Sequence, residues 1–390
     1  MMNNGHKRTC RILYVVQPER PGGAEISTLL LLSRLDRRKF VPIVLVPPDS
    51  PLEKDFQRMG VKTVGFVLPR IKTSNPFSVP FRLGRFIKTC LQIRNIIKQH
   101  SVQIVHAVSN KRTAAYGIVS ARLAKVRSIW TVRELQRDKA FDWLLLSGAD
   151  KVIAVSNAVK ACFKSNSIDG KMEMIYNAVD LDAFDSEMKS FGSFRAKWGL
   201  QEDKFIVAIA SRLVPIKRHT LFLKAASYVL KQEPSIAFVV IGDPKFDKDQ
   251  SYIQSLKSFC HDLGIKDSVQ FVGFEKNIPR MMLSIDVLTL CCENEPFGRV
   301  VVEARAMGKP FFALNSPEQR EIIVDGKSGV LVPPGDPIAL AEAILELYKD
   351  DKLRHRIGEA GRQRIQNVFT VQRHLEAHER VYEQVMASNI

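Results

Sequence analysis

Short apolar runs rich in β-branched residues alternate along the chain with longer stretches whose apolar residues recur every three or four positions. The first pattern predicts strands and the second helices, and their alternation is typical of parallel sheets with crossover helices. We expect one set of strands over 11–16, 41–46, 62–67, 103–107, 128–132, 151–155 and 173–176. A second set is expected over 205–211, 236–242, 269–274, 286–292, 310–314 and 329–334. Each set predicts one doubly wound α/β domain.

The alternation lapses between residues 180 and 200, where the chain is polar and has no strand periodicity. A link there divides the chain into a domain over 1–185 and a second domain over 200–369, each long enough to bury a core. The last amphipathic helix, over 370–390, is expected to pack back on the first domain. Two such domains facing each other leave a cleft, and ligands of these sheets bind outside the carboxyl ends of the strands.

The composition is that of a globular protein: 390 residues, 45% of them hydrophobic and 25% charged. No apolar run reaches the roughly 18 residues of a membrane-spanning helix. The six cysteines show neither zinc-site nor CxxC spacing, so free thiols are expected. These features exclude disordered, membrane-embedded and disulfide-stapled classes, and we expect a cytoplasmic protein.

The formal net charge of +17 comes entirely from the first half of the chain. Residues 1–200 hold 33 basic and 16 acidic residues, whereas residues 201–390 hold 25 of each. No carboxylate occurs between Asp55 and Glu134. The first domain is therefore expected to face an anionic partner.

Residues 81–100 combine this charge with an apolar stripe of Phe81, Phe86, Cys90, Ile93 and Ile97. A basic amphipathic helix with aromatic ends can lie on an anionic membrane surface. A crossover helix that packs its stripe on the sheet has the same pattern, so both interpretations stay open. Nucleic-acid binding is not expected, because no RNP-type or helix-turn-helix pattern accompanies the charge.

The segment CCENEPFGRVVVEARAMGKP carries most of the candidate chemistry. It predicts a helix that begins near Arg299. Glu295 precedes this helix, and Glu303 lies slightly more than one turn after its start. A helix amino terminus offers amides and a positive dipole end to phosphate, and flanking carboxylates accept hydrogen bonds from hydroxyls. A ligand with phosphate between two groups that carry hydroxyls is a nucleotide sugar. An ordinary helix with a solvated glutamate at each end would have the same sequence pattern.

Arg212 follows the strand over 205–211, and Lys217 precedes the next helix. A guanidinium and an ammonium at a strand end suit a diphosphate, unless they are simply a surface pair on a basic protein. Gly22 and Gly23 stand between the first strand and its helix, where a missing Cβ lets a ligand approach the backbone. No GxGxxG follows that strand, so a dinucleotide cofactor is not expected.

With its neighbours, the sequence EPFGRVVVEA resembles the E-x7-E signature of glycosyltransferase family 4, whose members are retaining enzymes with the GT-B fold. Further segments resemble the family in the same order: PGGAE, DKVIAVSNAVK, IYNAVDLDAF, SRLVPIKR, VQFVGF and DGKSGVLVPPGDP. The resemblance runs from about Arg11 to the final helix. It implies GT-B architecture, with two Rossmann-like domains that bind the acceptor and the nucleotide sugar respectively.

The resemblance also implies roles for matching residues in the second domain. Glu303 would bind the ribose hydroxyls, Arg212 and Lys217 the diphosphate, and Glu295 the sugar hydroxyls near C3 at the catalytic centre. Backbone groups around 272–274 would meet the base. The implied donor-binding residues are Arg212, Lys217, Gly273, Phe297, Gly298, Arg299, Val300 and Glu303.

His106 ends the strand over 103–107, and we expect it to face the cleft as a second catalytic candidate. Family members often carry two histidines here as H-x-H, but Val108 takes the second place, so His106 is either a ligand contact or a satisfied strand-end histidine. Arg133 and Glu134, after the next strand, are the candidates to contact sugar or acceptor.

Two further segments bear on cofactors and on the donor loop. Pro317-Glu318 stands where relatives often have a glycine pair, which leaves that loop's contact unassigned. The Asp-x-Asp pairs at 180–182 and 247–249 resemble metal-binding motifs only superficially. We therefore expect neither a metal nor another cofactor.

The resemblance thus implies a retaining glycosyltransferase that moves a sugar from a nucleoside diphosphate to an acceptor. The basic first domain adds the hypothesis of a lipid-linked or glycan acceptor at the cytoplasmic face of a membrane, with the anionic surface as a partner. Two alternatives remain: a nucleotide-sugar epimerase of the same fold, and a non-catalytic module that binds anionic polymers.

Overall fold

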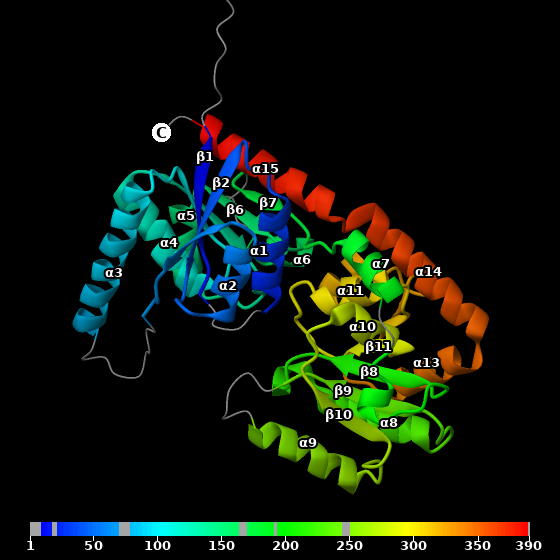
Figure 1. Ribbon diagram of the computed structural model, residues 1–390. Coiled ribbons are helices and arrows are strands. Elements are labelled where there is room, and N and C mark those ends of the chain that lie inside the picture. Colours follow the sequence, from blue (N-terminus) through cyan, green and yellow to red (C-terminus); the bar gives the residue numbers. More distant parts are fainter. Residues whose placement is uncertain are drawn as a thin grey trace, which may run out of the picture. The chain divides into compact units, whose positions relative to one another are not determined.

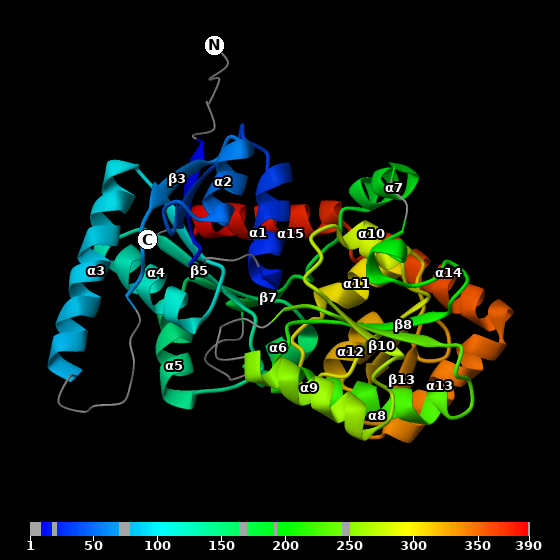
Figure 2. The ribbon, with the colours of Figure 1, turned by 60° about the horizontal axis from the view of Figure 1, so that its bottom comes forward.

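The computed structural model describes residues 9–17, 22–69, 79–163, 170–190, 193–243 and 250–388. The chain forms two compact units, unit 1 (Met1–Asn177 with Val371–Ile390) and unit 2 (Ala178–Thr370). Each unit holds a parallel sheet with helices on both faces, as Figures 1 and 2 show, which confirms the predicted pair of doubly wound α/β domains. The units divide before the predicted link, because helix α7 (Leu181–Ser190) within that link packs on α10 (Ile278–Leu283) of unit 2.

The sheet of unit 1 has seven strands among the described residues, in the order β3-β2-β1-β4-β5-β6-β7. All its ladders are parallel, and every strand end lies within two residues of the prediction. The strands are β1 (Cys10–Val15), β2 (Phe40–Val46), β3 (Lys62–Gly65), β4 (Ile104–Ala107), β5 (Arg127–Val132), β6 (Lys151–Ala154) and β7 (Met172–Met174).

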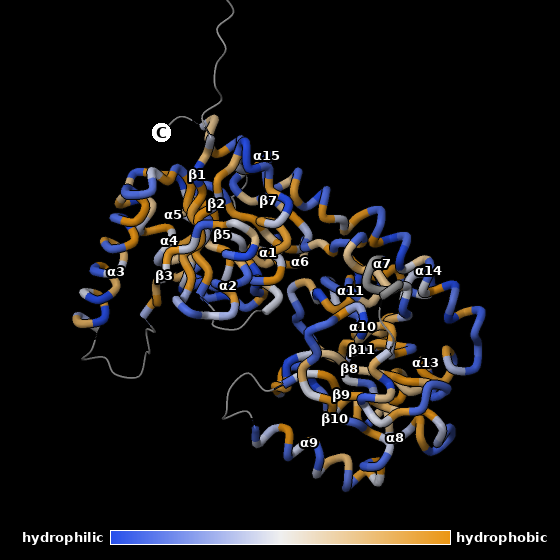
Figure 3. Tube along the Cα trace, in the orientation of Figure 1, coloured by the Kyte–Doolittle hydropathy of each residue, from blue (hydrophilic) through white to orange (hydrophobic). Residues whose placement is uncertain are grey.

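Helices cover both faces of this sheet because alternate strand residues point to opposite sides. On β1, Tyr14 faces a core shared with α1, α2 and α15, whereas Leu13 and Val15 face α3 and α4. Figure 3 shows hydrophobic residues concentrated along the strands and many hydrophilic residues in the surrounding helices. The helices are α1 (Gly23–Arg34), α2 (Pro51–Arg58), α3 (Val79–Gln99), α4 (Lys111–Ala124), α5 (Lys139–Gly148), α6 (Asn157–Cys162) and α15 (Val371–Ala387).

A buried polar network fixes α15 to the sheet of unit 1. The Tyr14 hydroxyl donates to the Tyr382 hydroxyl at 2.9 Å, and Nδ1 of His106 lies 3.1 Å from the same oxygen. Nε2 of His106 lies 2.8 Å from the Thr131 hydroxyl, so both ring nitrogens have partners. Of the two interpretations of His106, the satisfied strand-end histidine therefore holds: its side chain is fully buried and points to the face that α15 covers, not to a cleft.

The apolar stripe predicted over 81–100 divides in the structure. Cys90, Ile93 and Ile97 of α3 are buried in the core of unit 1. The Phe86 ring packs beside Tyr116, with ring centroids 4.7 Å apart. For these residues the crossover-helix interpretation holds.

The sheet of unit 2 has six strands in the described part, in the order β10-β9-β8-β11-β12-β13, again all parallel. The strands are β8 (Ile206–Ala210), β9 (Ala237–Ile241), β10 (Val269–Gly273), β11 (Val287–Leu290), β12 (Phe311–Leu314) and β13 (Val330–Val332). All six agree with the prediction to within two residues at each end.

Two helical layers enclose this second sheet. Val207 and Ile209 of β8 share a core with α8, α9 and α13, while α10, α11 and α14 pack together in the other layer. The remaining elements are the short helices η2 (Ala196–Trp198), η3 (Pro215–Lys217) and α12 (Pro317–Ile322). The layer helices are α8 (His219–Leu230), α9 (Gln250–Asp262), α11 (Arg299–Ala306), α13 (Pro337–Lys349) and α14 (Asp351–Val368).

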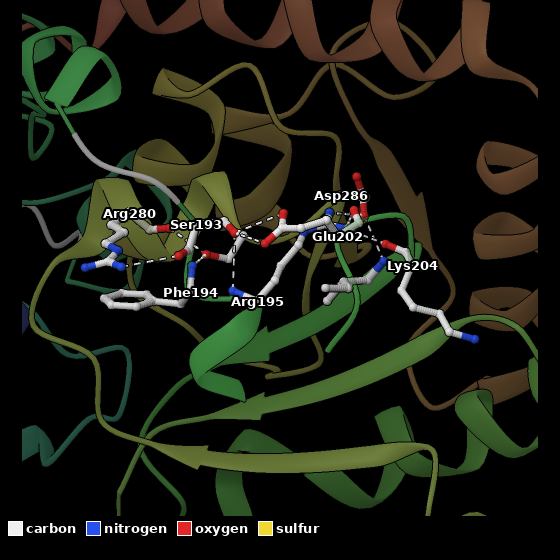
Figure 4. Close-up of polar contacts among 9 residues, drawn as sticks. Ser193, Phe194, Arg195, Glu202, Lys204, Arg280 and Asp286 are labelled. Carbon is white, nitrogen blue, oxygen red and sulfur yellow. Dashed lines mark hydrogen bonds and ion pairs between the residues drawn. The ribbon is translucent and has the colours of Figure 1, made fainter. Parts of the chain in front are cut away.

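Arg195 pins the segment that leads into β8 (Figure 4). Its Nη2 lies 2.9 Å from Oδ2 of Asp286, and its Nη1 donates to the carbonyls of Glu202 and Lys204, both at 2.6 Å. The same Asp286 oxygen accepts the amide of Ile206 at 2.8 Å. Because Ile206 begins β8 and Asp286 precedes β11, this cluster ties the amino ends of two neighbouring strands, and their carboxyl ends lie at the opposite edge.

Acid should destabilise this fold through its buried histidines. Burial lowers the pKa of His106 well below its ordinary value, and lowers the pKa of His219 and of His378 to about 4. Below about pH 6.5 the unfolded chain therefore takes up protons that the native state does not, and stability falls as pH falls. Each histidine contributes a slope of about 1.4 kcal/mol per pH unit.

Thermal unfolding at about pH 7.5, 6 and 5 checks this pH dependence. The His219→Gln variant should show a shallower fall of melting temperature than the parent, and the exposed His355→Gln variant should match the parent. A melting temperature that stays level or rises down to pH 5 would contradict the account.

Candidate functional site

The predicted site residues of unit 2 lie at one edge of its sheet. Arg212 and Lys217 follow β8, Gly273 ends β10, and Glu295 follows β11. Strands β10, β9, β8 and β11 are successive neighbours in the sheet. Since carboxyl ends of parallel strands share one edge, the fold brings these residues together, as the sequence predicts.

Lys217 and Glu295 form an ion pair at this edge. Nζ of Lys217 contacts Oε2 of Glu295, and both side chains are largely shielded from water. Lys217 reaches the carboxylate from the end of η3, while Arg212 is exposed at the start of the same loop. An anion entering here would compete with Glu295 for the ammonium, because partial burial strengthens both attractions.

The next turn of the loop pairs Arg218 with Glu293. The guanidinium meets the carboxylate through both Nη atoms, and Nη2 lies 2.9 Å from Oε2. Such two-pronged pairs fix orientation as well as charge. Arg218 itself has a left-handed φ of 52°, and it begins the transition from η3 into α8. The sequence analysis did not anticipate this pair.

The amino terminus of α11 opens beside Glu295. Gly298 caps the helix with a φ of +74°, and Val301 donates the first hydrogen bond back to the Gly298 carbonyl at 2.9 Å. The amides of Gly298, Arg299 and Val300 precede that bond and have no intrahelical acceptor. Together with the helix dipole they present positive partial charge at the edge where Glu295 lies.

Two predicted donor residues next to Gly298 have partners inside unit 2. Nη2 of Arg299 lies 2.8 Å from Oε1 of Glu303, and its Nη1 donates to the Ala178 carbonyl at 3.4 Å. Glu303 is almost fully buried on the inner turn of α11. The Phe297 ring is buried against Phe369, with centroids 5.8 Å apart, so Phe297 can offer a ligand only its backbone. The donor contact at Phe297 stays a prediction, and its backbone is the part that could make it.

Gly273 keeps two strand ends close together at this edge. It has a φ of +74°, and its carbonyl accepts the amide of Gly242 at 2.8 Å. A Cβ on Gly242 would lie 1.9 Å from the Ser211 carbonyl oxygen, so only glycine fits there. The ends of β8, β9 and β10 therefore pack closely through their backbones, while the contact between Gly273 and a base stays a prediction.

The short helix α12, which follows β12, adds two polar residues that the sequence analysis left without a role. Glu318 and Gln319 are buried, at 4% and 0% exposed. A Cβ on Gly298 would lie 3.4 Å from Nε2 of Gln319 and 3.4 Å from Cγ of Glu295. Gln319 thus lies at the amino terminus of α11 beside Glu295, and polar residues directly after an apolar strand were the signal in the sequence.

In unit 1, the predicted glycine loop makes room for a buried carboxylate. The amide of Gly22 donates to Oε2 of Glu25 at 2.9 Å, and the Ser109 hydroxyl donates to Oε1 at 3.2 Å. A Cβ on Gly22 would lie 3.0 Å from Glu25 Oε2. Gly23 begins α1. A ligand contact at Gly22 and Gly23 stays a prediction.

Arg133 and Glu134 lie at the carboxyl end of β5. Arg133 donates from Nε to the Val108 carbonyl at 3.1 Å and from Nη1 to Oδ1 of Asn177 at 2.7 Å. Glu134 is half-buried, 4.0 Å from Nζ of Lys111. Burial raises the pKa of Glu134, and the nearby ammonium opposes that rise. Arg133 thus links neighbouring strand ends, and Asn177 joins this group without having been predicted.

The two Asp-x-Asp pairs differ in where they fall. Oδ1 of Asp180 accepts the amide of Ala183 at 3.3 Å, which caps α7. The pair at 247–249 lies outside the described residues. Within the ranges that the structure describes, no group of three or more His, Cys, Asp or Glu side chains could hold a metal ion. The expectation of a reaction without metal or other cofactor stays a prediction.

Two family models match the chain in sequence order. The model described as Glycosyltransferase Family 4 matches residues 21–183, and the model described as Glycosyl transferases group 1 matches residues 190–364. Together they cover most of both units. The chain belongs to this family of glycosyltransferases, and it has the family's GT-B fold.

Individual relatives agree with that assignment. The Escherichia coli protein named UDP-Gal:alpha-D-GlcNAc-diphosphoundecaprenol alpha-1,3-galactosyltransferase is 25% identical over 313 residues, which cover 76% of this chain and 79% of the relative. A glycosyltransferase from Rickettsia africae superposes with a TM-score of 0.81 at 22% identity, covering 98% of this chain and 100% of its own. Anabaena HepE, solved with UDP and glucose, superposes with a TM-score of 0.78 at 22% identity, covering 95% and 99%. The two structures share the fold.

Gly298 should tolerate no side chain. The Gly298→Ala variant would place a Cβ 2.9 Å from Cγ2 of Val301 in a left-handed conformation, whereas Gly335, with a φ of +77°, has open space around it. We expect Gly335→Ala to lose about 1 kcal/mol of unfolding free energy and Gly298→Ala to lose at least about 1 kcal/mol more. Urea unfolding of both variants measures the difference. Equal losses of unfolding free energy would show that the space around Gly298 is not crowded.

Proposed function

We propose that unit 2 binds a nucleoside diphosphate sugar and that the protein transfers this sugar, with retention of anomeric configuration, to an acceptor bound by unit 1. The observation that carries the proposal is the Lys217–Glu295 pair beside the amino terminus of α11, with Glu303 further along the same helix. Cations and a helix amino terminus suit a diphosphate, and the two carboxylates can accept hydrogen bonds from hydroxyl groups.

Each group of this site has a distinct task in the proposal. The diphosphate draws Lys217 away from Glu295 and takes a second cation from Arg212, while the first amides of α11 bind its oxygens. Glu295, released from its ammonium, accepts hydrogen bonds from the sugar. Glu303 keeps one oxygen on Arg299 and offers the other to the ribose.

The reaction then breaks the bond between the sugar C1 and the diphosphate oxygen and forms a bond from C1 to the acceptor oxygen on the same face. The acceptor hydroxyl gives its proton to the departing phosphate oxygen. Positioning and the positive charge of Lys217, Arg212 and the helix terminus lower the barrier as negative charge develops on the leaving group. His106 has no part in this step because it is buried in the core of unit 1.

The acceptor side of the proposal depends on the outer surface of α3. Phe81 is 76% exposed, and Leu83, Ile87 and Leu91 form an exposed apolar row along the same helix. Beside Phe81, a hollow of about 630 Å³ is lined by apolar and basic residues: Phe66, Val67, Pro69, Phe81, Gly84, Arg85, Lys88, Thr89 and Gln92. Basic side chains among exposed apolar ones match a lipid-linked phosphate at an anionic surface.

We therefore propose a lipid-linked acceptor and peripheral attachment to the cytoplasmic face of a membrane. The E. coli relative, whose name specifies a diphosphoundecaprenol acceptor, supports this choice. Its name also specifies a UDP sugar, and HepE was solved with UDP, so we propose uracil as the base. In the described part of the chain, no helix has the length and apolarity to cross a bilayer.

A nucleotide should stabilise the folded protein selectively. Binding to the native state alone raises the melting temperature, so we expect UDP to exceed GDP, ADP and CMP in a thermal-shift screen. Arg212→Ala and Glu303→Ala should reduce the shift, each by weakening binding about tenfold or more. Lys266→Ala, which removes an exposed charge just before β10 at the opposite edge, should leave it unchanged.

The same screen separates the alternatives. A selective shift lost in both variants supports the donor site, and no shift with any nucleotide would contradict it and favour a module that binds anionic polymers. Turnover of the nucleotide sugar with acceptor absent would instead indicate an epimerase.

Vesicle binding tests the membrane part of the proposal. We expect the protein to sediment with vesicles containing about 30% anionic lipid at low salt, and to bind neutral vesicles far more weakly. Arg85→Gln with Lys88→Gln should weaken binding about tenfold or more, since each cation contributes about 1 kcal/mol. The matched double change Lys352→Gln with Arg356→Gln on α14 should have no effect. Equal, weak binding to both kinds of vesicle would contradict this part alone.

A further inference from the structure

Two buried polar groups at the end of β12 lack partners in the protein. Among the described residues, neither the amide nitrogen nor the amide oxygen of Gln319 has a hydrogen-bond partner, although the side chain is 0% exposed. Oε1 of Glu318, in a residue 4% exposed, also has none there. Buried polar atoms are rarely left unpaired, because losing water without a replacement is costly. The unpaired polar atoms of Gln319 and Glu318 therefore indicate a bound ligand.

The surroundings show where that ligand would lie. Nε2 of Gln319 would be 3.4 Å from a Cβ on Gly298, so the amide borders the first turn of α11. Burial raises the pKa of Glu318, and the negative charge of Glu295 adds to that rise. Burial also raises the pKa of the Cys292 thiol, and the charges of Lys217, Glu295 and Glu318 all act on that thiol. Gln319 thus lies beside Glu295 at the amino terminus of α11, and Glu318 lies near enough to Glu295 for their charges to interact.

The chemistry of the unpaired atoms selects the kind of group that binds. The Gln319 amide needs both an acceptor for its nitrogen and a donor for its oxygen. Burial raises the pKa of Glu318, so its carboxyl can accept a hydrogen bond when ionised and donate one when protonated. Phosphate oxygens only accept, so a diphosphate could satisfy no more than the amide nitrogen. Hydroxyl groups both donate and accept. A polyol satisfies all three atoms, and the sugar is the polyol that a donor brings next to its diphosphate.

We infer that the side chains of Gln319 and Glu318 bind hydroxyl groups of the transferred sugar, which makes them specificity-determining residues at the carboxyl end of β12. The inference rests on the proposed function, since it takes the ligand to be a nucleotide sugar. It gives the Pro317-Glu318 loop a task that a glycine pair, having no side chains, could not perform. Glu295 and Glu318 together would also disfavour a sugar that carries a carboxylate.

The test compares a nucleotide with and without its sugar. Calorimetric titration gives dissociation constants for UDP, GDP and ADP and for UDP-glucose, UDP-galactose, UDP-N-acetylglucosamine, GDP-mannose and ADP-glucose. The ratio between a bare diphosphate and its tightest sugar conjugate isolates the sugar contacts. We expect Gln319→Leu and Glu318→Gln each to reduce this ratio about three- to tenfold, as the loss of one or two hydrogen bonds predicts. Affinity for the bare diphosphate should stay within twofold.

Three controls make the outcomes distinct. Exposed Gln232→Leu and Glu342→Gln repeat the chemical changes away from the site and should leave every constant unchanged. Arg212→Ala should weaken the bare diphosphate and its conjugates alike. Without ligand, the Gln319→Leu variant should have a melting temperature equal to or above that of the parent protein, because an unpaired buried amide is replaced by an apolar group of similar size.

Each remaining outcome overturns a specific statement. Suppose that a bare diphosphate binds and that the ratio of its dissociation constant to that of its tightest sugar conjugate is unchanged in both variants. This result would contradict the inference alone, and water rather than sugar would then satisfy the Gln319 and Glu318 side chains. A lower melting temperature for Gln319→Leu would show that the amide is paired within the protein, again contradicting it. Failure of all three bare diphosphates to bind would contradict the proposed function, and the inference with it.

Discussion

The candidate site depends on one constraint: parallel strands end at the same edge of the sheet. In unit 2 that edge brings Lys217, from the loop after β8, to Glu295, from the loop after β11. The resulting ion pair places opposite charges beside the amino terminus of α11. An anion with attached hydroxyls can use both halves once it separates them, with the ammonium on phosphate and the carboxylate on sugar. Until such an anion binds, the charges of Lys217 and Glu295 neutralise each other.

The opposite ends of the strands are fixed in a way that leaves this edge available. Arg195 and Asp286 tie together the amino ends of β8 and β11, and the buried Tyr14–Tyr382–His106 network does comparable work for α15 in unit 1. Groups in these clusters have partners, which is what a structural role requires. Gln319 and Glu318 instead retain unpaired buried atoms at the carboxyl edge.

The sequence predicted the strands to within two residues because β-branched runs and helical periodicity are local properties. It also placed Lys217 and Glu295 correctly at one edge, since each follows a strand. It left open what depends on the face that a side chain takes: His106 and Phe297 both turn inward, toward α15 and Phe369. The burial of Gln319 and the unpaired state of its amide depend on how α12 packs beside the first turn of α11, which polar residues after an apolar strand do not specify.

The central claim, that a diphosphate takes Lys217 from Glu295, is tested most directly by a double-mutant cycle on UDP affinity. Glu295→Gln, Lys217→Met and the double variant are titrated with bare UDP under identical salt. The account predicts that Glu295→Gln tightens UDP binding several-fold by freeing the ammonium, and that this gain shrinks when Lys217 is already Met. Weaker UDP binding in Glu295→Gln, or additive effects of the two changes, would contradict it.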